Sequence, residues 1–371
     1  MSKLVYTLQG QSWHARAWNF TLNWIEIKTP AFMPVWTKAT IKWMPLEMMN
    51  GDWLWTDPIN LILANTFHLY LSPGDQRIKN QWWLHKFENW DRLILTDSWW
   101  FQVFSLWLSK SWKSLVRIVD SWVEFRSPKD GSKHFFTPTW VVDIQRNFWS
   151  DIMMVLDVCS PTRNISKDTV AQHMKLTHQR ATQQFDYFET CYNDSRGVLF
   201  PIIQWWLYKD LRQESLSFLQ KYARDWIAIW WLSVWETRDE MAETLWYIAD
   251  NLPKNVPRYL MWVGTPEDLL VAIENGIDVF DCVHPTRIWR HGVGMKLWWN
   301  IKITNTCHRD DPSSLVELCP CYTCRNFSKA YIHHLFREWE ALWWTLLSLH
   351  NISYLTQICT NKRQEIMSKS V

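Results

Sequence analysis

Glycine is scarce in this chain, which has only 9 glycines among 371 residues. Ordinary chains carry about 7% glycine, which would be roughly 26 residues here. Tryptophan is correspondingly abundant, with 31 residues. Many tryptophans stand where turn chemistry favours glycine, in doublets at 82–83, 99–100, 205–206, 230–231, 298–299 and 343–344. We interpret many of them as replacing glycine; a tryptophan-rich binding surface is the alternative interpretation.

The chain also lacks long apolar runs and a strong charge of either sign. No segment approaches the roughly 18 apolar residues of a membrane-spanning helix, and residues 1–10 are too polar for a secretory signal. The net charge is only +2, so nucleic-acid binding would have to rest on a local basic patch. Eight cysteines, mostly scattered, are typical of a reducing compartment. We therefore expect a cytoplasmic protein without membrane association.

Three cysteines lie within six residues, at Cys319, Cys321 and Cys324. Thiolates at this spacing can all face one point, and Zn²⁺ takes three or four such ligands in a tetrahedron. The spacing leaves the fourth ligand open among His308, His333, His334 and His350. A set of three cysteines and one histidine leaves no open coordination position, which favours a structural zinc over a catalytic one.

Short apolar runs that end in a polar residue dominate the rest of the chain. They occupy residues 61–64, 92–96, 152–156, 198–203 and 277–280, and such continuous runs indicate buried parallel strands. Helical segments alternate with them. The clearest helix begins after the N-cap candidate Thr265 and ends before Gly276. Others are expected at 167–188, 210–222 and 237–250.

This alternation predicts an α/β protein built as an irregular (β/α)₈ TIM barrel with a small zinc-binding subdomain. A doubly wound open sheet is weaker, because no glycine-rich phosphate-binding fingerprint is present. We expect residues 1–300 to form the barrel, with N-terminal antiparallel strands closing its bottom. Residues 301–371, with a helical stretch at 328–350, should form the zinc-binding subdomain and C-terminal helices packing on the barrel.

Three of the strand-ending residues are carboxylates, namely Asp97, Asp157 and Asp281. In a barrel these would meet at the C-terminal mouth, where one can act as nucleophile and another as general acid or base. Capping of neighbouring loops is the plain alternative. Gln204 also ends a strand and can pair with an amide-bearing base. Phe101 and Met261 read, on sequence alone, as core residues.

A local basic strip follows Asp281 closely. It contains Arg287, Arg290, His291, Lys296 and Lys302. Contact with RNA phosphates or base edges is one interpretation, and a solvated face is the other.

The chain resembles the tRNA-guanine transglycosylases over residues 32–358. The similar stretches are 29–35 (Thr-Pro-Ala-Phe-Met-Pro-Val), 64–69 (Ala-Asn-Thr-Phe-His-Leu), 95–98 with 101–103, 280–283 with 285–287, and 319–326 with 328–334. The resemblance implies a (β/α)₈ barrel, one structural Zn²⁺ and exchange of guanine at the wobble position of tRNAs with G-U-N anticodons. The base inserted by the bacterial branch is 7-aminomethyl-7-deazaguanine.

The resemblance also implies a role for individual residues. Asp281 would be the nucleophile toward ribose and Asp97 the general acid/base. The base would be bound by a set of pocket residues: Asp157, Gln204, Trp231, Leu232, Phe101 and Met261. Arg287 and Arg290 would contact the anticodon. The zinc ligands would be Cys319, Cys321, Cys324 and His350, and the protein would be a homodimer.

Three tryptophan doublets stand where the family has glycine pairs: 99–100, 205–206 and 230–231. Because overpacking costs about 1–3 kcal/mol per buried site, we expect this chain to be poorly folded or inactive as written. Three other functional hypotheses remain. A non-catalytic tRNA-binding subunit would be expected to lack the nucleophile, and an archaeal-type enzyme would carry further C-terminal RNA-binding domains. An unrelated zinc hydrolase would need histidine and aspartate ligands at strand ends.

Overall fold

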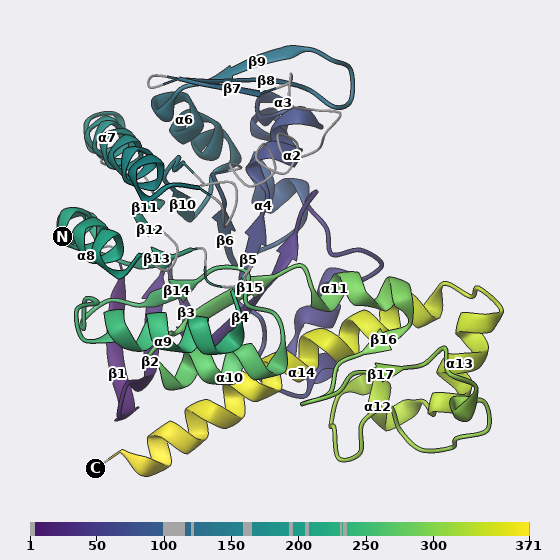
Figure 1. Ribbon diagram of the computed structural model, residues 1–371. Helices are drawn as coiled ribbons and strands as arrows, with labels where there is room; N and C mark the ends of the chain where they lie inside the picture. Colours follow the sequence, from purple (N-terminus) through teal and green to yellow (C-terminus); the bar gives the residue numbers. More distant parts are fainter. Residues whose placement is uncertain are drawn as a thin grey trace.

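The computed structural model describes residues 4–98, 116–119, 122–158, 165–192, 196–204, 208–230, 232 and 236–370. Its largest sheet has nine strands in the order β11-β10-β6-β5-β4-β15-β14-β13-β12 (Figure 1). They are β4 (Ala31–Trp36), β5 (Leu61–Ala64), β6 (Leu93–Thr96), β10 (Ile152–Met154), β11 (Val198–Phe200), β12 (Ile202–Ile203), β13 (Ile227–Ile229), β14 (Arg258–Leu260) and β15 (Val279–Cys282).

This sheet forms a barrel whose ring of strands is interrupted at a single residue. The two strands at the ends of the order, β11 and β12, are consecutive in the chain and separated only by Pro201. The Pro201 carbonyl still accepts a hydrogen bond from Ala228 N at 3.0 Å. Counting β11 and β12 as one interrupted strand gives the eight parallel strands of a TIM barrel. The predicted α/β class and barrel are therefore confirmed.

Helices connect the strands and cover the barrel. They are α1 (Gly51–Leu54), α2 (Thr66–Leu71), α3 (Asp75–Asn80), α4 (Trp83–Phe87), α6 (Pro138–Phe148), α7 (Lys167–Cys191), α8 (Lys209–Leu219), α9 (Arg238–Ala249) and α10 (Pro266–Glu274). The predicted cap of α10 is present, since the Thr265 hydroxyl accepts a hydrogen bond from Asp268 N at 3.2 Å. Gly276 has φ +83°, in keeping with its predicted place after the helix.

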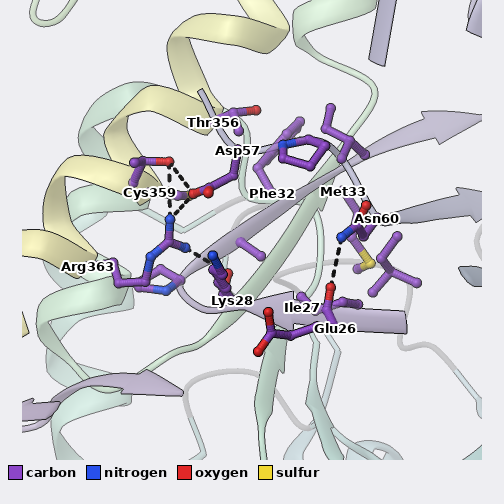
Figure 2. A pocket seen from close by; sticks show the side chains of 16 residues that line it. Glu26, Ile27, Lys28, Phe32, Met33, Asp57, Asn60, Thr356, Cys359 and Arg363 are labelled. Atoms are coloured by element: carbon purple, nitrogen blue, oxygen red, sulfur yellow. Dashed lines mark hydrogen bonds and ion pairs between the residues drawn. The ribbon is translucent and has the colours of Figure 1, made fainter. Parts of the chain in front are cut away.

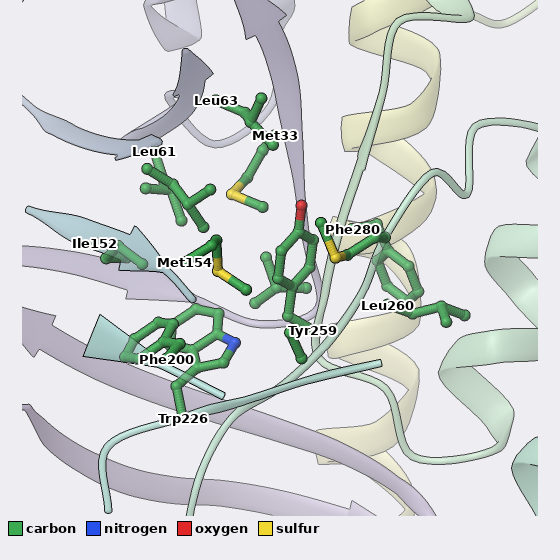
Figure 3. Packing of buried hydrophobic residues seen from close by; sticks show 14 of the residues in the cluster. Met33, Leu61, Leu63, Ile152, Met154, Phe200, Trp226, Tyr259, Leu260 and Phe280 are labelled. Atoms are coloured by element: carbon green, nitrogen blue, oxygen red, sulfur yellow. The ribbon is translucent and has the colours of Figure 1, made fainter. Parts of the chain in front are cut away.

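An antiparallel sheet lies at the bottom of the barrel. It consists of β1 (Val5–Ser12), β2 (Ala15–Leu22) and β3 (Ile25–Lys28). Arg16 on β2 forms a buried ion pair with Asp278, which directly precedes β15. Phe20 packs edge-on against Trp226, whose ring stacks on Phe200 inside the barrel. Figure 3 shows Trp226 and Phe200 in this core.

Two features were not predicted. Strands β7 (Val116–Ile118), β8 (Val123–Arg126) and β9 (Lys133–Phe136) form an antiparallel sheet between β6 and α6. The helical stretch expected at 328–350 is two helices, α13 (Lys329–Arg337) and α14 (Leu342–Lys369). The chain turns between them at Trp339, which has φ +58° and cannot continue a right-handed helix.

A second, smaller core lies beside the barrel. It combines residues of α12 (Tyr322–Asn326), α13 and α14 with α11 (Pro285–Ile288) and the hairpin β16 (Val293–Gly294) and β17 (Ile301–Lys302) nearby. Helix α14 runs from this core across the barrel to β1, as Figure 1 shows in yellow. The domain boundary at residue 300 stays a prediction. None of the described helices is long and apolar enough to span a bilayer.

Tryptophan occupies backbone positions that normally belong to glycine. Fourteen non-glycine residues of the described chain have positive φ, and ten of them are tryptophan: Trp13, Trp24, Trp43, Trp55, Trp82, Trp83, Trp149, Trp262, Trp298 and Trp339. The left-handed region costs a residue with a Cβ roughly 1–2 kcal/mol. The structure thus carries a strain that glycine would remove.

The neighbours Trp298 and Trp299 offer a matched test of this strain. Both are 67% exposed, but only Trp298 has positive φ. We expect Trp298→Gly to raise the free energy of unfolding by about 1 kcal/mol, because glycine adopts φ +71° without strain. Trp299→Gly should lower it by about 0.5–1 kcal/mol, because glycine only adds chain entropy there. Urea unfolding of both variants measures the difference; equal effects would contradict the strain.

Candidate functional site

The strand-ending polar residues meet at one end of the barrel. Asp97 follows β6 directly, Gln204 follows β12, Asp157 lies three residues after β10, and Asp281 is the third residue of β15. These strands are parallel, so their C-terminal ends share one face of the sheet. The site therefore forms at the predicted mouth, from four separate connections.

Asp281 is the most deeply buried carboxylate of the site, with 1% of its surface exposed. One of its oxygens accepts hydrogen bonds from the Tyr259 hydroxyl at 2.7 Å and from Trp262 N at 2.9 Å. Burial raises the pKa of Asp281 to about 6, and these two donors oppose the rise. The carboxylate is thus charged at neutral pH, poorly solvated and held in one orientation, which suits a nucleophile.

Asp97 is held at the start of α2. Its oxygens accept hydrogen bonds from Thr66 N at 2.8 Å and from the Asn65 side-chain amide. Burial raises the pKa of the Tyr259 phenol well above its ordinary value, and the negative charges of Asp281 and, more weakly, Asp97 add to that rise. The negative charges of both carboxylates therefore raise the pKa of the same phenol. The structure brings together the two residues that sequence analysis paired as nucleophile and acid/base.

Asp157 and Gln204 form a buried polar pair next to them. The Gln204 amide nitrogen donates to one Asp157 oxygen, and the Ser98 hydroxyl donates to the other at 3.0 Å. Among the described residues, the buried Gln204 carbonyl oxygen has no hydrogen-bond partner. A buried acceptor without a donor is costly unless a ligand supplies one. An amide-bearing base carries such donors.

Two indole rings occupy the same region. Trp262, whose backbone N–H binds Asp281, faces Trp230 edge-on with ring centroids 5.4 Å apart. Trp230 is buried, as are Leu232 and Met261. Phe101 and Trp231 lie outside the described residues, as do the doublets at 99–100 and 205–206. Of the predicted base-binding set, Asp157, Gln204, Leu232 and Met261 can thus be placed.

The predicted anticodon-binding arginines lie beside this mouth. Arg287 is on α11, directly after β15, and Arg290 follows in the short helix at Trp289–His291. Both side chains are exposed.

Four predicted zinc ligands converge in the second core. The sulfur atoms of Cys319, Cys321 and Cys324 lie 3.9, 3.5 and 3.3 Å from His350 Nδ1, and all four ligand atoms lie within 4.8 Å of one another. A tetrahedral Zn²⁺ with its usual bond lengths separates its ligands by about 3.5–3.8 Å. The His350 Nε2 atom contacts the Met295 carbonyl oxygen at 2.9 Å, which orients the ring. The geometry fits zinc.

The other histidine candidates lie elsewhere. His333 contacts the Ile303 carbonyl oxygen and His308 lies beside Asp311. Only His350 joins the three cysteines among the described residues.

Sequence reasoning missed Tyr259 as a site residue. An aromatic residue within an apolar run reads as core, and the ring does pack in the barrel interior beside Met33 and Met154 (Figure 3). Only its hydroxyl reaches Asp281. Asn65 did carry a signal, because it ends the apolar run at 61–64 in the same manner as the predicted site residues.

A separate cavity of about 220 Å³ lies at the other end of the barrel (Figure 2). It is lined by residues of β3, β4 and α14. Arg363 from α14 crosses it to pair with Asp57 and to donate to the Lys28 carbonyl oxygen at 2.9 Å. These groups satisfy one another's hydrogen-bonding capacity, and their contacts hold α14 against the barrel.

Comparison with known proteins matches this arrangement to one family. A family model described as queuine tRNA-ribosyltransferase matches residues 11–371. A protein of Caldanaerobacter subterraneus subsp. tengcongensis named queuine tRNA-ribosyltransferase is 44% identical over 340 residues, covering 92% of this chain and 87% of that protein. Proteins of the same name from Azoarcus sp. and Fusobacterium nucleatum are 41% and 40% identical, covering 97% and 99% of this chain and 94% and 95% of theirs.

The environment of Asp281 predicts a titration that does not depend on activity. We expect ¹³C NMR of labelled aspartate to show one carboxyl with a pKa of about 6 that is lost in Asp281→Asn. Tyr259→Phe removes a donor that stabilises the anion, so it should raise this pKa by about one further unit. An unchanged pKa in Tyr259→Phe would show that the phenol does not stabilise the charge.

Proposed function

We propose a specific reaction for this chain, which belongs to the queuine tRNA-ribosyltransferase family, a family of pentosyltransferases. The chain exchanges guanine at the wobble position of tRNAs with G-U-N anticodons for 7-aminomethyl-7-deazaguanine. The observation that carries this proposal is the placement of Asp281 and Asp97 around one phenol at the barrel mouth. Two differently solvated carboxylates at one site supply a nucleophile and an acid/base group.

In the first half-reaction, an Asp281 oxygen forms a bond to the anomeric carbon of ribose as the bond to guanine breaks. The Asp97 carboxyl group gives its proton to the departing guanine. Tyr259 and the N–H of residue 262 hold the attacking carboxylate, so little reorganisation is needed. The product is a covalent aspartyl-ribosyl RNA with an uncut backbone.

In the second half-reaction, a ring nitrogen of the incoming base forms a bond to the same carbon, and the bond to Asp281 breaks. The proton of that nitrogen goes to Asp97, which restores both carboxyl groups to their starting state. Two displacements retain the configuration at the sugar. The covalent intermediate conserves the energy of the glycosidic bond, so no nucleoside triphosphate is required.

The polar pair Asp157 and Gln204 would read the edge of the base. Among the described residues, no donor binds the carbonyl oxygen of Gln204, which is therefore available to a ring N–H or amino group, and Asp157 accepts a second. Leu232 would add a backbone carbonyl and residue 231 a backbone N–H. Phe101 and Met261 would sandwich the ring. The target base reaches this buried pocket only when flipped out, which suits a single-stranded anticodon loop.

The remaining parts of the proposal concern zinc, RNA and assembly. Cys319, Cys321, Cys324 and His350 would hold one structural Zn²⁺, which when bound cross-links the second core. Arg287 and Arg290 would contact the anticodon beside the mouth. A homodimer is proposed from the resemblance alone.

A non-catalytic tRNA-binding subunit of the same family is the second candidate. The positions of Asp281 and Asp97 speak against it, because a subunit without chemistry has no need of a buried carboxylate whose charge is costly.

The first test is incorporation of labelled guanine into an unmodified tRNA with a G-U-N anticodon. Trp262 binds Asp281 through its backbone N–H and its ring contacts that of Trp230, so two large side chains belong to the site region and we expect the chain as written to be slow or inactive. Replacing residues 99, 100, 205, 206, 230, 231 and 262 together by glycine should restore exchange. The same variant with Asp281→Asn is the control. Exchange that survives Asp281→Asn would refute the covalent mechanism.

The pH dependence of exchange should follow Asp281. Its raised pKa means that the reactive carboxylate is lost as the pH falls through about 6. We expect kcat/KM in the glycine variant to fall about tenfold per pH unit below 6. Tyr259→Phe should move this limb to higher pH. A limb near pH 4 in both proteins would contradict the role of burial.

We expect the zinc to stabilise the fold and to take no part in the reaction, which the carboxylates carry out. We expect Cys321→Ser to abolish zinc retention and to lower Tm by several degrees, because the site cross-links the second core. Cys307→Ser, at an exposed cysteine outside the cluster, is the matched control. Metal content by mass spectrometry and thermal unfolding give the readouts; a variant that keeps its Tm but loses rate would indicate a catalytic metal.

A further inference from the structure

Three lysines surround His68 next to the site. Lys38 and Lys42 follow β4, and Lys129 lies in the turn between β8 and β9. All three side chains are exposed. Burial lowers the pKa of His68 to about 4, and the charges of Lys38, Lys129 and Lys42 add to that effect. His68 is therefore neutral at pH 7, and the three lysines lie close enough to act on one ring.

The fold holds these lysines in place around the mouth. His68 lies on α2, whose N-cap residue Asn65 also binds Asp97. The β8–β9 sheet packs on the same helix, with Phe125 against Phe67 at 5.4 Å and His134 Nδ1 3.0 Å from the Tyr70 hydroxyl oxygen. The sheet that sequence analysis missed thus carries Lys129 toward the site.

These lysines continue the basic surface of Arg287 and Arg290. Strand β4 is the neighbour of β15, so the connections that follow the two strands lie side by side. The positive charges of Arg290, Lys38 and Arg287 all lower the pKa of Lys42, after the larger effect of its partial burial. Within the described part of the chain, none of the five cations has an ion-pair partner. The nearby Asp130 carboxylate is engaged by Ser132.

We propose that Lys38, Lys42 and Lys129, the lysine arc, bind the phosphates of the RNA strand that flanks the flipped nucleotide, and so extend the contact made by Arg287 and Arg290. This inference rests on the proposed function, because it takes the substrate to be an RNA loop. Flipping a base costs stacking energy, and holding the adjacent backbone lowers that cost. Cations that have no ion-pair partner among the described residues are available to a polyanion.

The test is direct binding of a labelled anticodon stem-loop RNA at several salt concentrations. Lys38→Ala/Lys129→Ala is compared with Lys175→Ala/Lys254→Ala, which removes the same charge from exposed lysines on α7 and before β14. The arc variant should raise Kd about tenfold and reduce the slope of log Kd against log salt by about 1.4, or 0.7 per phosphate contact. The control should change neither.

The lysine arc and the guanine exchange reaction would be refuted by different results. Equal Kd and slope in the arc and control variants would overturn the lysine arc, even if guanine exchange proceeds. Loss of RNA affinity in the arc variant, with no exchange by any active-site variant, would support the arc and refute the exchange reaction.

A second inference concerns the tryptophans and rests on a different observation. Ten tryptophans have the positive φ that suits glycine. In addition, six indole N–H groups among the described residues are buried without a hydrogen-bond partner, those of Trp18, Trp36, Trp226, Trp289, Trp343 and Trp344. Native proteins rarely leave buried donors unpaired. Trp90 differs, because its φ is not positive and its indole donates to the Leu93 carbonyl oxygen at 3.2 Å.

We infer that the ten positive-φ tryptophans are glycine in the protein that its own cell makes. A single codon that is read as tryptophan in one genetic code and as glycine in another would produce this pattern. Tryptophan is encoded by UGG alone in the standard code, and UGA, which differs in one base, is read differently in different genetic codes. A cell that reads UGA as glycine would make a chain with ordinary glycine content, free of the strain at these positions.

The gene and the native protein test this inference. We expect UGA at the ten positive-φ positions and UGG at Trp90. Peptide mass spectrometry of the protein from its own cells should show glycine at Trp13, Trp82 and Trp298, and tryptophan at Trp90. UGG codons at the ten positions, or tryptophan in the native peptides, would overturn it.

Discussion

The parallel pairing of β4 with β15 is the contact on which the rest of the molecule depends. It joins Ala31–Pro34 with Val279–Cys282, segments nearly 250 residues apart, and so closes the barrel. Closure of so long a loop costs chain entropy that only the assembled core can offset. Its lower end is fixed by Asp278, which accepts hydrogen bonds from Arg16 and from Arg258 N. Its upper end places Asp281 beside the connection that carries Lys38.

At that upper end, burial sets the chemistry. The interior that packs Tyr259 and Met33 also removes water from Asp281, and this makes its charge costly. Two donors, the Tyr259 hydroxyl on β14 and the N–H of Trp262 two residues after that strand, stabilise the charge. A nucleophile needs this balance: without the donors the carboxyl group would be protonated, and in water it would be less reactive. Asp97, held at the start of a helix, has a different environment and, in the proposed mechanism, a different role.

Tryptophan conflicts with this architecture at the places where the backbone turns. A barrel mouth is made of short connections, and these require positive φ and close approach of backbone to ligand. Trp262 has such a backbone, at φ +68°, and its N–H is one of the two donors to Asp281. The backbone at this position thus has a conformation typical of glycine, although the residue carries an indole side chain that contacts Trp230.

The sequence by itself determined the class of fold, the strand ends and the cysteine cluster. These are local signals: apolar runs of strand length, the polar residue after each, and three thiols within six residues. Through resemblance it also predicted a set of candidate site residues, most of which lie among the described residues. The tertiary structure alone decided what depends on contacts between distant segments. It brought the Tyr259 hydroxyl to Asp281, selected His350 as the histidine that joins the cysteines, and carried Lys129 to the mouth on a sheet with no clear sequence signal. Side-chain type and spacing report which group is present, whereas its partners depend on how the barrel closes.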